Sequence, residues 1–267
     1  MIPLINPQWI ASGSIPSYTG LLNRATSSAQ IFSTFKQNPN FLGPVGFTSG
    51  DYAMLSISQS NAISAALLPV SQARNDVYGT PYAINLSGSR KIGWDTCRFF
   101  GTIGYIIENF TSDMTGKSVY EWGSNYGGLM TCMLETWPNM ATYYCNDLPE
   151  VVNFSNYYIA QLEASGGLSF TTTIWNDPTG SNAPTASIDL FVSEYAMTEM
   201  DTGSMYTIYN NYGKNANGVF IRTNLLNFGQ FQQFLDTVQQ DFTCSVINEP
   251  MSRPGNKVIL GIKADKW

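Results

Sequence analysis

The chain has 267 residues, of which 43% are apolar and only 12% are charged, about half the charged share usual in globular proteins. Its net charge is −6 with 13 Lys and Arg and no basic run, which argues against a domain that holds nucleic acid by its phosphates. No stretch approaches the roughly 18 apolar residues of a membrane span, and Pro3, Asn6 and Pro7 interrupt any signal peptide. We therefore expect a soluble chain without a signal of its own, folded as one large domain or two small ones.

The first third of the chain is predicted to be an arm followed by short elements. Residues 1–25 form the arm, because the first sixteen contain three prolines, little charge and no periodicity. An Ala-rich stretch ending before Pro69 suits a short helix. In chain order we expect a strand at 30–36, a loop at 38–44, a strand at 46–57, the helix at 58–68 and turns at 74–94.

The middle of the chain is predicted to consist of strands. Residues 99–110 are rich in β-branched and aromatic side chains, which favour strands. Residues 168–175 and 186–193 alternate apolar and polar side chains with period two, which is typical of half-buried strands. Short strands at regular spacing indicate a sandwich or barrel. The remaining strands of this region are expected at 118–122, 128–136, 140–145 and 156–163.

The last seventy residues are predicted to mix one helix with three strands. One helical stripe is formed by Phe231, Phe234, Leu235, Val238 and Phe242. With no linker before it, we treat this part as an elaboration of the same domain. The strands are expected at 218–222, 242–247 and 257–262.

Several kinds of chemistry are absent. The chain has no histidine, which excludes Ser-His-Asp and Cys-His nucleophile activation and histidine metal sites. Residues 115–118 resemble the end of a phosphate loop, but Thr111 stands where the loop needs a glycine, so we interpret them as a surface turn. The four cysteines form no C-x-x-C pair and are expected to be buried, reduced thiols: Cys97, Cys132, Cys145 and Cys244.

Three weaker site hypotheses stay open. Glu108 and Glu121 would face one another across a hairpin and form the carboxylate pair of a glycoside hydrolase. Aromatic groups, Trp122 with Tyr126 and Tyr143-Tyr144, would stack on sugars, although core packing uses the same residues. A Ca²⁺ site would draw on loop acids: Asp147, Glu150, Asp177, Glu199 and Asp201. Solvated acids and buried rings are the expected alternatives, so we predict no catalytic, cofactor or metal residues.

Three segments together resemble the jelly-roll capsid proteins of picornavirus-like viruses, in particular those of the insect-infecting branch. Residues 99–122 are similar to the central hairpin of that family, with an aromatic-x-Gly opening and a polar turn. Residues 160–175 look like the pair in which an acidic turn precedes an outward-leading strand, and residues 184–193 resemble the final strand of the roll. The resemblance covers about half of the chain.

The resemblance implies an eight-stranded antiparallel jelly-roll β-sandwich with short helices. Residues 1–25 would be the arm, 26–197 the sandwich and 198–267 a C-terminal extension of one domain. It further implies a structural, non-enzymatic subunit of a small icosahedral RNA virus, assembled in the host cytoplasm into the virion. The partners would be further copies, related subunits, a host receptor at surface loops and, weakly, the genomic RNA.

Two other classes of function remain alternatives. A secreted or fibre-type carbohydrate-binding β-sandwich predicts export and a stable free subunit. A hydrolase requires two carboxylates about 5 to 10 Å apart in one cleft.

Overall fold

The structure, a computed structural model, describes residues 14–45, 73–85, 91–165, 173–176, 187–224, 228–249 and 255–267. Its centre is a seven-stranded sheet in the order β5-β4-β3-β6-β7-β9-β8. All neighbouring pairs from β5 to β7 are parallel, and β9 runs antiparallel to both β7 and β8. The strands are β3 (Ser118–Trp122), β4 (Thr142–Asn146), β5 (Thr173–Asn176), β6 (Leu190–Glu194), β7 (Gly218–Thr223), β8 (Thr243–Asn248) and β9 (Lys257–Ile262).

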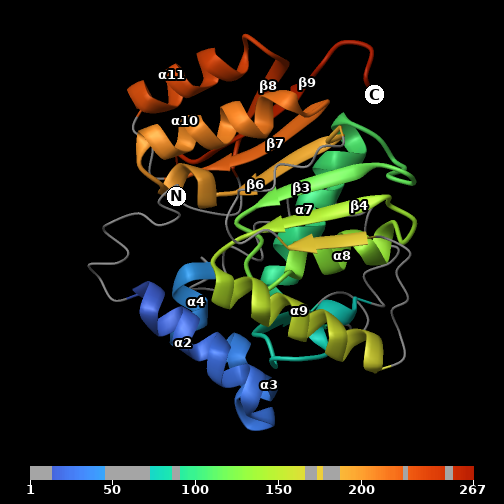
Figure 1. The fold of residues 1–267 in the computed structure, drawn as a ribbon, viewed down its shortest axis with the longest axis vertical. Helices are drawn as coiled ribbons and strands as arrows, with labels where there is room; N and C mark the ends of the chain where they lie inside the picture. Colours follow the sequence, from blue (N-terminus) through green and yellow to red (C-terminus); the bar gives the residue numbers. More distant parts are fainter. Residues whose placement is uncertain are drawn as a thin grey trace.

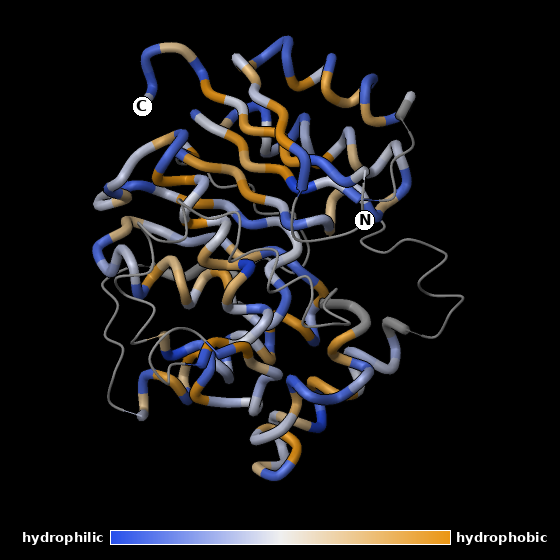
Figure 2. The backbone as a smooth tube through the Cα atoms, turned by 180° about the vertical axis from the view of Figure 1, so that it is seen from behind, coloured by the Kyte–Doolittle hydropathy of each residue, from blue (hydrophilic) through white to orange (hydrophobic). Residues whose placement is uncertain are grey.

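Helices cover both faces of this sheet (Figure 1). On one face lie α7 (Trp94–Asn109), α8 (Gly128–Thr136) and α9 (Pro149–Ala164), and on the other lie α10 (Thr202–Asn211) and α11 (Phe228–Val238). Successive strand residues serve the two faces in turn, so Val119 packs with α7 and α8 while Tyr120 packs with α10. Strands buried on both faces are apolar along their length, as Figure 2 shows for the central strands.

The N-terminal segment, residues 14–45, is helical and packs against α9, on one side of the helix-covered sheet (Figure 1). It contains α2 (Ser14–Ser27), α3 (Ala29–Thr34), a 3₁₀ turn (Phe35–Gln37) and α4 (Pro39–Val45). Ser28 caps α3 by accepting a hydrogen bond from the Ile31 N–H. A small antiparallel hairpin, β1 (Ala83–Asn85) with β2 (Lys91–Gly93), leads directly into α7.

Part of the predicted secondary structure is confirmed. Strands occur where residues 118–122, 140–145, 186–193, 218–222, 242–247 and 257–262 predicted them. The helical stripe is α11, and its Phe234 and Val238 are fully buried. Of the strand expected at 168–175, the structure describes residues 173–175, which lie in β5.

Other predicted elements are wrong. The strands expected at 99–110, 128–136 and 156–163 are the helices α7, α8 and α9. The strand at 30–36 is α3 with its 3₁₀ turn, the loop at 38–44 is α4, and the described part of the extended arm is α2. The strand at 46–57 and the helix at 58–68 lie outside the described residues.

The jelly-roll fold is also wrong. A jelly roll pairs antiparallel strands in two packed sheets, whereas this chain forms one largely parallel sheet between two helical layers. The cause is α7 and α8, which are buried almost all round and therefore carry the same continuous apolar run as a core strand. With helices in these places, α8 becomes the crossover from β3 to β4 and α9 the crossover from β4 to β5, and both pairs of strands are parallel.

Candidate functional site at the carboxyl edge of the sheet

The winding of the sheet marks one place for a site. From β3 the chain proceeds outward through β4 to β5, and then returns to the other side of β3 to form β6 and β7. Ligands of open α/β sheets bind beyond the carboxyl ends of the strands at such a switch point. Here that point lies between β3 and β6, whose register pairs Glu121 with Val192.

A tight turn follows β3 at this point and leads into α8. Gly123 and Gly127 have φ of 80° and 83°, and Asn125 between them has φ of 51°. A Cβ on Gly123 would lie 2.1 Å from the Cβ of Ala196, which follows β6. The turn therefore needs glycine both for its backbone conformation and for its contact with the segment after β6.

The backbone N–H groups of this turn are all used within the chain. Each of residues 123–127 donates to an acceptor in the turn or at the end of β4. The acceptors are the carbonyl of Asn146 for Gly123 (2.8 Å) and Ser124 (3.2 Å), Asp147 Oδ2 for Asn125 (2.7 Å), Asn125 Oδ1 for Tyr126 (2.7 Å) and the Ser124 carbonyl for Gly127 (3.0 Å). The turn thus offers no open cradle of N–H groups to a phosphate.

Asp147, the residue after β4, is the carboxylate beside this turn. Its Oδ2 accepts the N–H of Asn125 and its Oδ1 that of Leu148, both at 2.7 Å. These bonds hold the carboxylate in one orientation, while each oxygen keeps a second lone pair for a further donor. Desolvation raises the pKa of Asp147 to about 6, so the group is an anionic acceptor at neutral pH.

Glu121 lies in β3, just before the turn at this edge, and its side chain is buried in the core. It accepts a hydrogen bond from the Tyr143 hydroxyl at 2.8 Å, and burial raises its pKa to about 8. The carboxyl group is therefore protonated at neutral pH. Its predicted partner Glu108 is on α7 rather than on a facing strand, so the hairpin-borne hydrolase pair is wrong.

A buried ionic network lies beside the edge, at the ends of β6 and β7. Glu194 pairs with Arg98 (3.2 Å) and Arg222 (3.8 Å), and Arg222 also pairs with Glu249 (3.3 Å). Two positive and two negative charges balance, which is what burial of ions requires. Tyr195, directly after β6, has φ of 71°, so backbone strain falls next to the switch point.

The remaining predicted site residues do not come together. Among the described residues no group of three metal-ligating side chains exists, and Asp177 of the Ca²⁺ hypothesis lies outside them. Asp201 caps α10, and Glu199 accepts from Asn224. Trp122, Tyr126 and Tyr143 are buried core residues, and all four cysteines are free thiols.

The sequence carried a signal for the turn and its acid. The stretch from Glu121 to Gly127 reads E-x-G-x-x-x-G and begins in the last two residues of a strand that was correctly predicted. Asp147 directly follows another. Because the sequence analysis predicted no parallel sheet, it did not indicate that these two strand ends lie side by side.

No family model and no curated protein matches the sequence. Solved structures with a similar fold include an O-methyltransferase family protein from Burkholderia thailandensis (9% identity, TM-score 0.46, 81% of this chain and 73% of that one). Others are the methyltransferase domain of a bacterial CtHen1 (10%, 0.47, 62% and 97%) and the METTL16 methyltransferase domain (10%, 0.46, 76% and 97%). Likenesses of this size transfer no residue role and no activity.

The capsid hypothesis is corrected by the fold. It rested on an antiparallel jelly roll, and the chain instead forms one doubly wound, largely parallel α/β sheet. The expected shell partners, the virion localisation and the non-enzymatic role are wrong with it. The carbohydrate-binding sandwich is wrong for the same reason. No helix among the described residues is long and apolar enough to cross a membrane.

Proposed function

We propose that this chain binds a nucleoside cofactor that carries no phosphate, of the S-adenosylmethionine class, and acts as a methyltransferase. The observation that carries the proposal is the pairing of a turn whose N–H groups are saturated with an oriented carboxylate at the end of the next strand. In doubly wound folds, an acid in this position accepts hydrogen bonds from ribose hydroxyls. Because each oxygen of Asp147 can accept one more hydrogen bond, the carboxylate can bind both hydroxyl groups of a vicinal diol.

The same turn argues against a dinucleotide. A diphosphate needs open N–H donors and a glycine at the second position of G-x-G-x-x-G, so that the backbone can approach. Here the corresponding residue is Asn125, its N–H is held by Asp147, and the other N–H groups of residues 123–127 are also bound. A phosphate-free cofactor avoids this requirement.

The charge of the edge suits a cationic ligand. Asp147 is anionic at neutral pH, and the chain as a whole carries −6. When bound, S-adenosylmethionine supplies an electrophilic methyl group on a positively charged sulfur. The role of the chain is to orient the cofactor through Asp147 and the turn, in a setting where negative charge stabilises the cation.

The test is calorimetric binding of S-adenosylhomocysteine and of NAD to the wild-type chain and to Asp147→Asn. We expect the wild type to bind S-adenosylhomocysteine and not NAD, and the variant to lose at least about tenfold in affinity, because hydrogen bonds to a carboxylate are lost. Wild-type affinity should also fall as pH drops below about 6, where Asp147 becomes protonated.

A matched control is Asp189→Asn. Asp189 also accepts a backbone N–H, that of Ser118 at 2.8 Å, but at the start of β3. Its substitution should leave the affinity unchanged. Equal losses in both variants, preference for NAD, or no binding of S-adenosylhomocysteine to the wild type would contradict the proposed function. Transfer of a labelled methyl group from S-adenosylmethionine to cellular acceptors, reduced in Asp147→Asn, tests the reaction itself.

A further inference from the structure

The N-terminal segment contacts two consecutive residues of the turn after β3. Tyr18 of α2 is only 5% exposed, and its hydroxyl donates a hydrogen bond to Asn125 Oδ1. Lys36, in the 3₁₀ turn after α3, is 1% exposed and lies over the ring of Tyr126, 4.7 Å from its centroid. Two consecutive turn residues, Asn125 and Tyr126, are thus in contact with this segment.

The contact of Tyr18 fixes the side chain of Asn125. Asn125 Oδ1 already accepts the N–H of Tyr126, and a backbone N–H can only donate, so this atom is the oxygen of the carboxamide. Tyr18 donates to the same oxygen. The carboxamide is thereby held in one orientation within a residue whose φ is 51°.

The contact of Lys36 belongs to a buried polar cluster beneath the turn. The Tyr126 hydroxyl donates to Asp95 and accepts from the Asn75 side chain at 2.9 Å. The Lys36 ammonium lies 3.6 Å from the same Asp95 carboxylate and donates to the Asn75 carbonyl. Both hydrogen-bond partners of the Tyr126 hydroxyl, Asp95 and Asn75, are therefore themselves in contact with Lys36.

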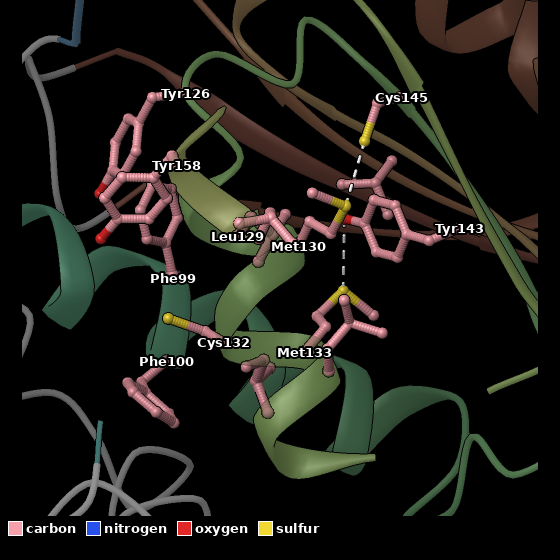
Figure 3. Packing of buried hydrophobic residues seen from close by; sticks show 14 of the residues in the cluster. Phe99, Phe100, Tyr126, Leu129, Met130, Cys132, Met133, Tyr143, Cys145 and Tyr158 are labelled. Carbon is pink, nitrogen blue, oxygen red and sulfur yellow. Dashed lines mark hydrogen bonds between the residues drawn. The ribbon is translucent and has the colours of Figure 1, made fainter. Parts of the chain in front are cut away.

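Tyr158 of α9 closes this cluster. Its ring centroid is 5.2 Å from that of Tyr126, nearly perpendicular to it, and the two rings lie together beside α8 (Figure 3). Its hydroxyl donates to the Asn75 carbonyl at 2.6 Å and lies 3.4 Å from the Lys36 ammonium. A lysine that is desolvated among aromatic rings and paired with a carboxylate is retained only where its partners are organised around it.

We infer that Tyr18 and Lys36 are positioning residues of the cofactor site, which hold the turn after β3 through Asn125 and Tyr126. The N-terminal segment is thus a working part of the site, although neither residue belongs to the sheet or its crossovers. This inference rests on the proposed function for its ligand, while the position of the turn can be measured without any ligand.

The first test uses Tyr18→Phe, which removes one hydroxyl and keeps the ring against Phe41. We expect affinity for S-adenosylhomocysteine to fall about fivefold, as for loss of one hydrogen bond, and the melting temperature to fall by only about 2 to 4 °C. Amide hydrogen exchange of residues 123–128 should rise, and that of β9 should not. The matched control is Tyr209→Phe, which removes a tyrosine-to-carboxylate bond to Asp241 (2.8 Å) on the opposite face of the sheet.

The second test compares Lys36→Met with Lys36→Met/Asp95→Asn. The single variant leaves Asp95 buried without its cation and should fold poorly. The double variant removes one positive and one negative charge together, so the net charge of the cluster, which also contains Asp76, stays the same. The new asparagine would still offer an oxygen to the Tyr126 hydroxyl, so we expect cooperative melting of this variant. Its turn should nevertheless exchange faster than in the wild type, and its affinity should fall about tenfold, because the Asn75 carbonyl and the Tyr126 ring have lost their cation.

The outcomes separate the two proposals. Faster exchange confined to residues 123–128 in both Tyr18→Phe and the double variant supports the positioning role, even if the wild type binds no S-adenosylhomocysteine and the proposed function fails. Unchanged exchange at the turn, or exchange that rises equally in β9, overturns the positioning role even if S-adenosylhomocysteine binds. A loss of the same size in Tyr209→Phe also overturns it.

Discussion

Two acids, one buried in the core and one at the candidate site, have raised pKa values. Glu121 and Asp147 stand at or near the ends of adjacent strands, and burial raises the pKa of both. They differ in use: Glu121 is neutral at pH 7 and accepts from Tyr143 within the core, whereas Asp147 is anionic at the edge. Environment, rather than residue type, separates the structural acid Glu121 from Asp147, the acid proposed to bind the cofactor.

Glu121 makes the free energy of unfolding depend on pH. Its pKa is about 8 in the folded chain and near 4.5 when unfolded, so between these values the folded state binds more protons. Stability from this group is therefore present at low pH and is lost as pH rises through this window, by up to about 1.4 kcal/mol per pH unit. We expect Glu121→Gln, which stays neutral and still accepts from Tyr143, to show a flatter pH dependence in urea unfolding between pH 5 and 8.

Glu163→Gln, at the exposed end of α9, is the control and should follow the wild-type curve. A constant difference between Glu121→Gln and the wild type at every pH would contradict the assignment.

At the scale of elements, the turn between β3 and α8 combines two demands on glycine. Gly123 must adopt a positive φ and must also admit Ala196 from the segment after β6. Gly116, before β3, also has a positive φ (71°), but its Cβ position has open space within 4 Å. A comparison of substitutions at Gly116 and Gly123 therefore separates the energetic cost of backbone strain from that of steric crowding.

We expect Gly116→Ala to cost about 1 to 2 kcal/mol, the strain of a left-handed L-residue. Gly123→Ala should cost about 1 to 3 kcal/mol more, because its methyl group overlaps Ala196. Urea unfolding of both variants measures the difference. Equal losses would show that the segment after β6 moves aside easily, and that the two sides of the switch point are not tightly packed.

At the scale of the whole molecule, the C-terminal third completes the sheet rather than decorating it. β9 is inserted between β7 and β8 and pairs with both along its full length. α11 buries Phe234 and Val238 on the sheet face that α10 also covers. Both layers of the core therefore depend on residues beyond Asn224.

We expect deletion of residues 224–267 to abolish folding. The deletion exposes β7, which is buried on both faces, as a long apolar edge, and such edges aggregate. Solubility on expression and the near-ultraviolet circular dichroism of the truncated chain are the measurements. A soluble truncated chain with a cooperative melting transition would contradict this expectation.

The amino-acid sequence alone was enough to establish the absence of histidine chemistry and the acidic balance, and to predict the helix α11 and the strands that became β3, β4, β6, β7, β8 and β9. These are local properties. Period-two alternation and short β-branched runs indicate strands, and one apolar stripe at 3.6-residue spacing indicates a helix that covers a surface.

Two features depend on tertiary contacts and were not predicted: α7, α8 and α9 are helices, and the strands between them pair in parallel. α7 and α8 are buried almost all round and show no polar face, so their sequence pattern matches that of a core strand, whereas α9 exposes Asn153, Asn156 and Glu163. Strand pairing, in turn, joins segments far apart in the chain. The same pairing places Asp147 beside Asn125 and brings Tyr18 and Lys36 to the turn. The candidate site is made of such long-range contacts, which no local pattern encodes.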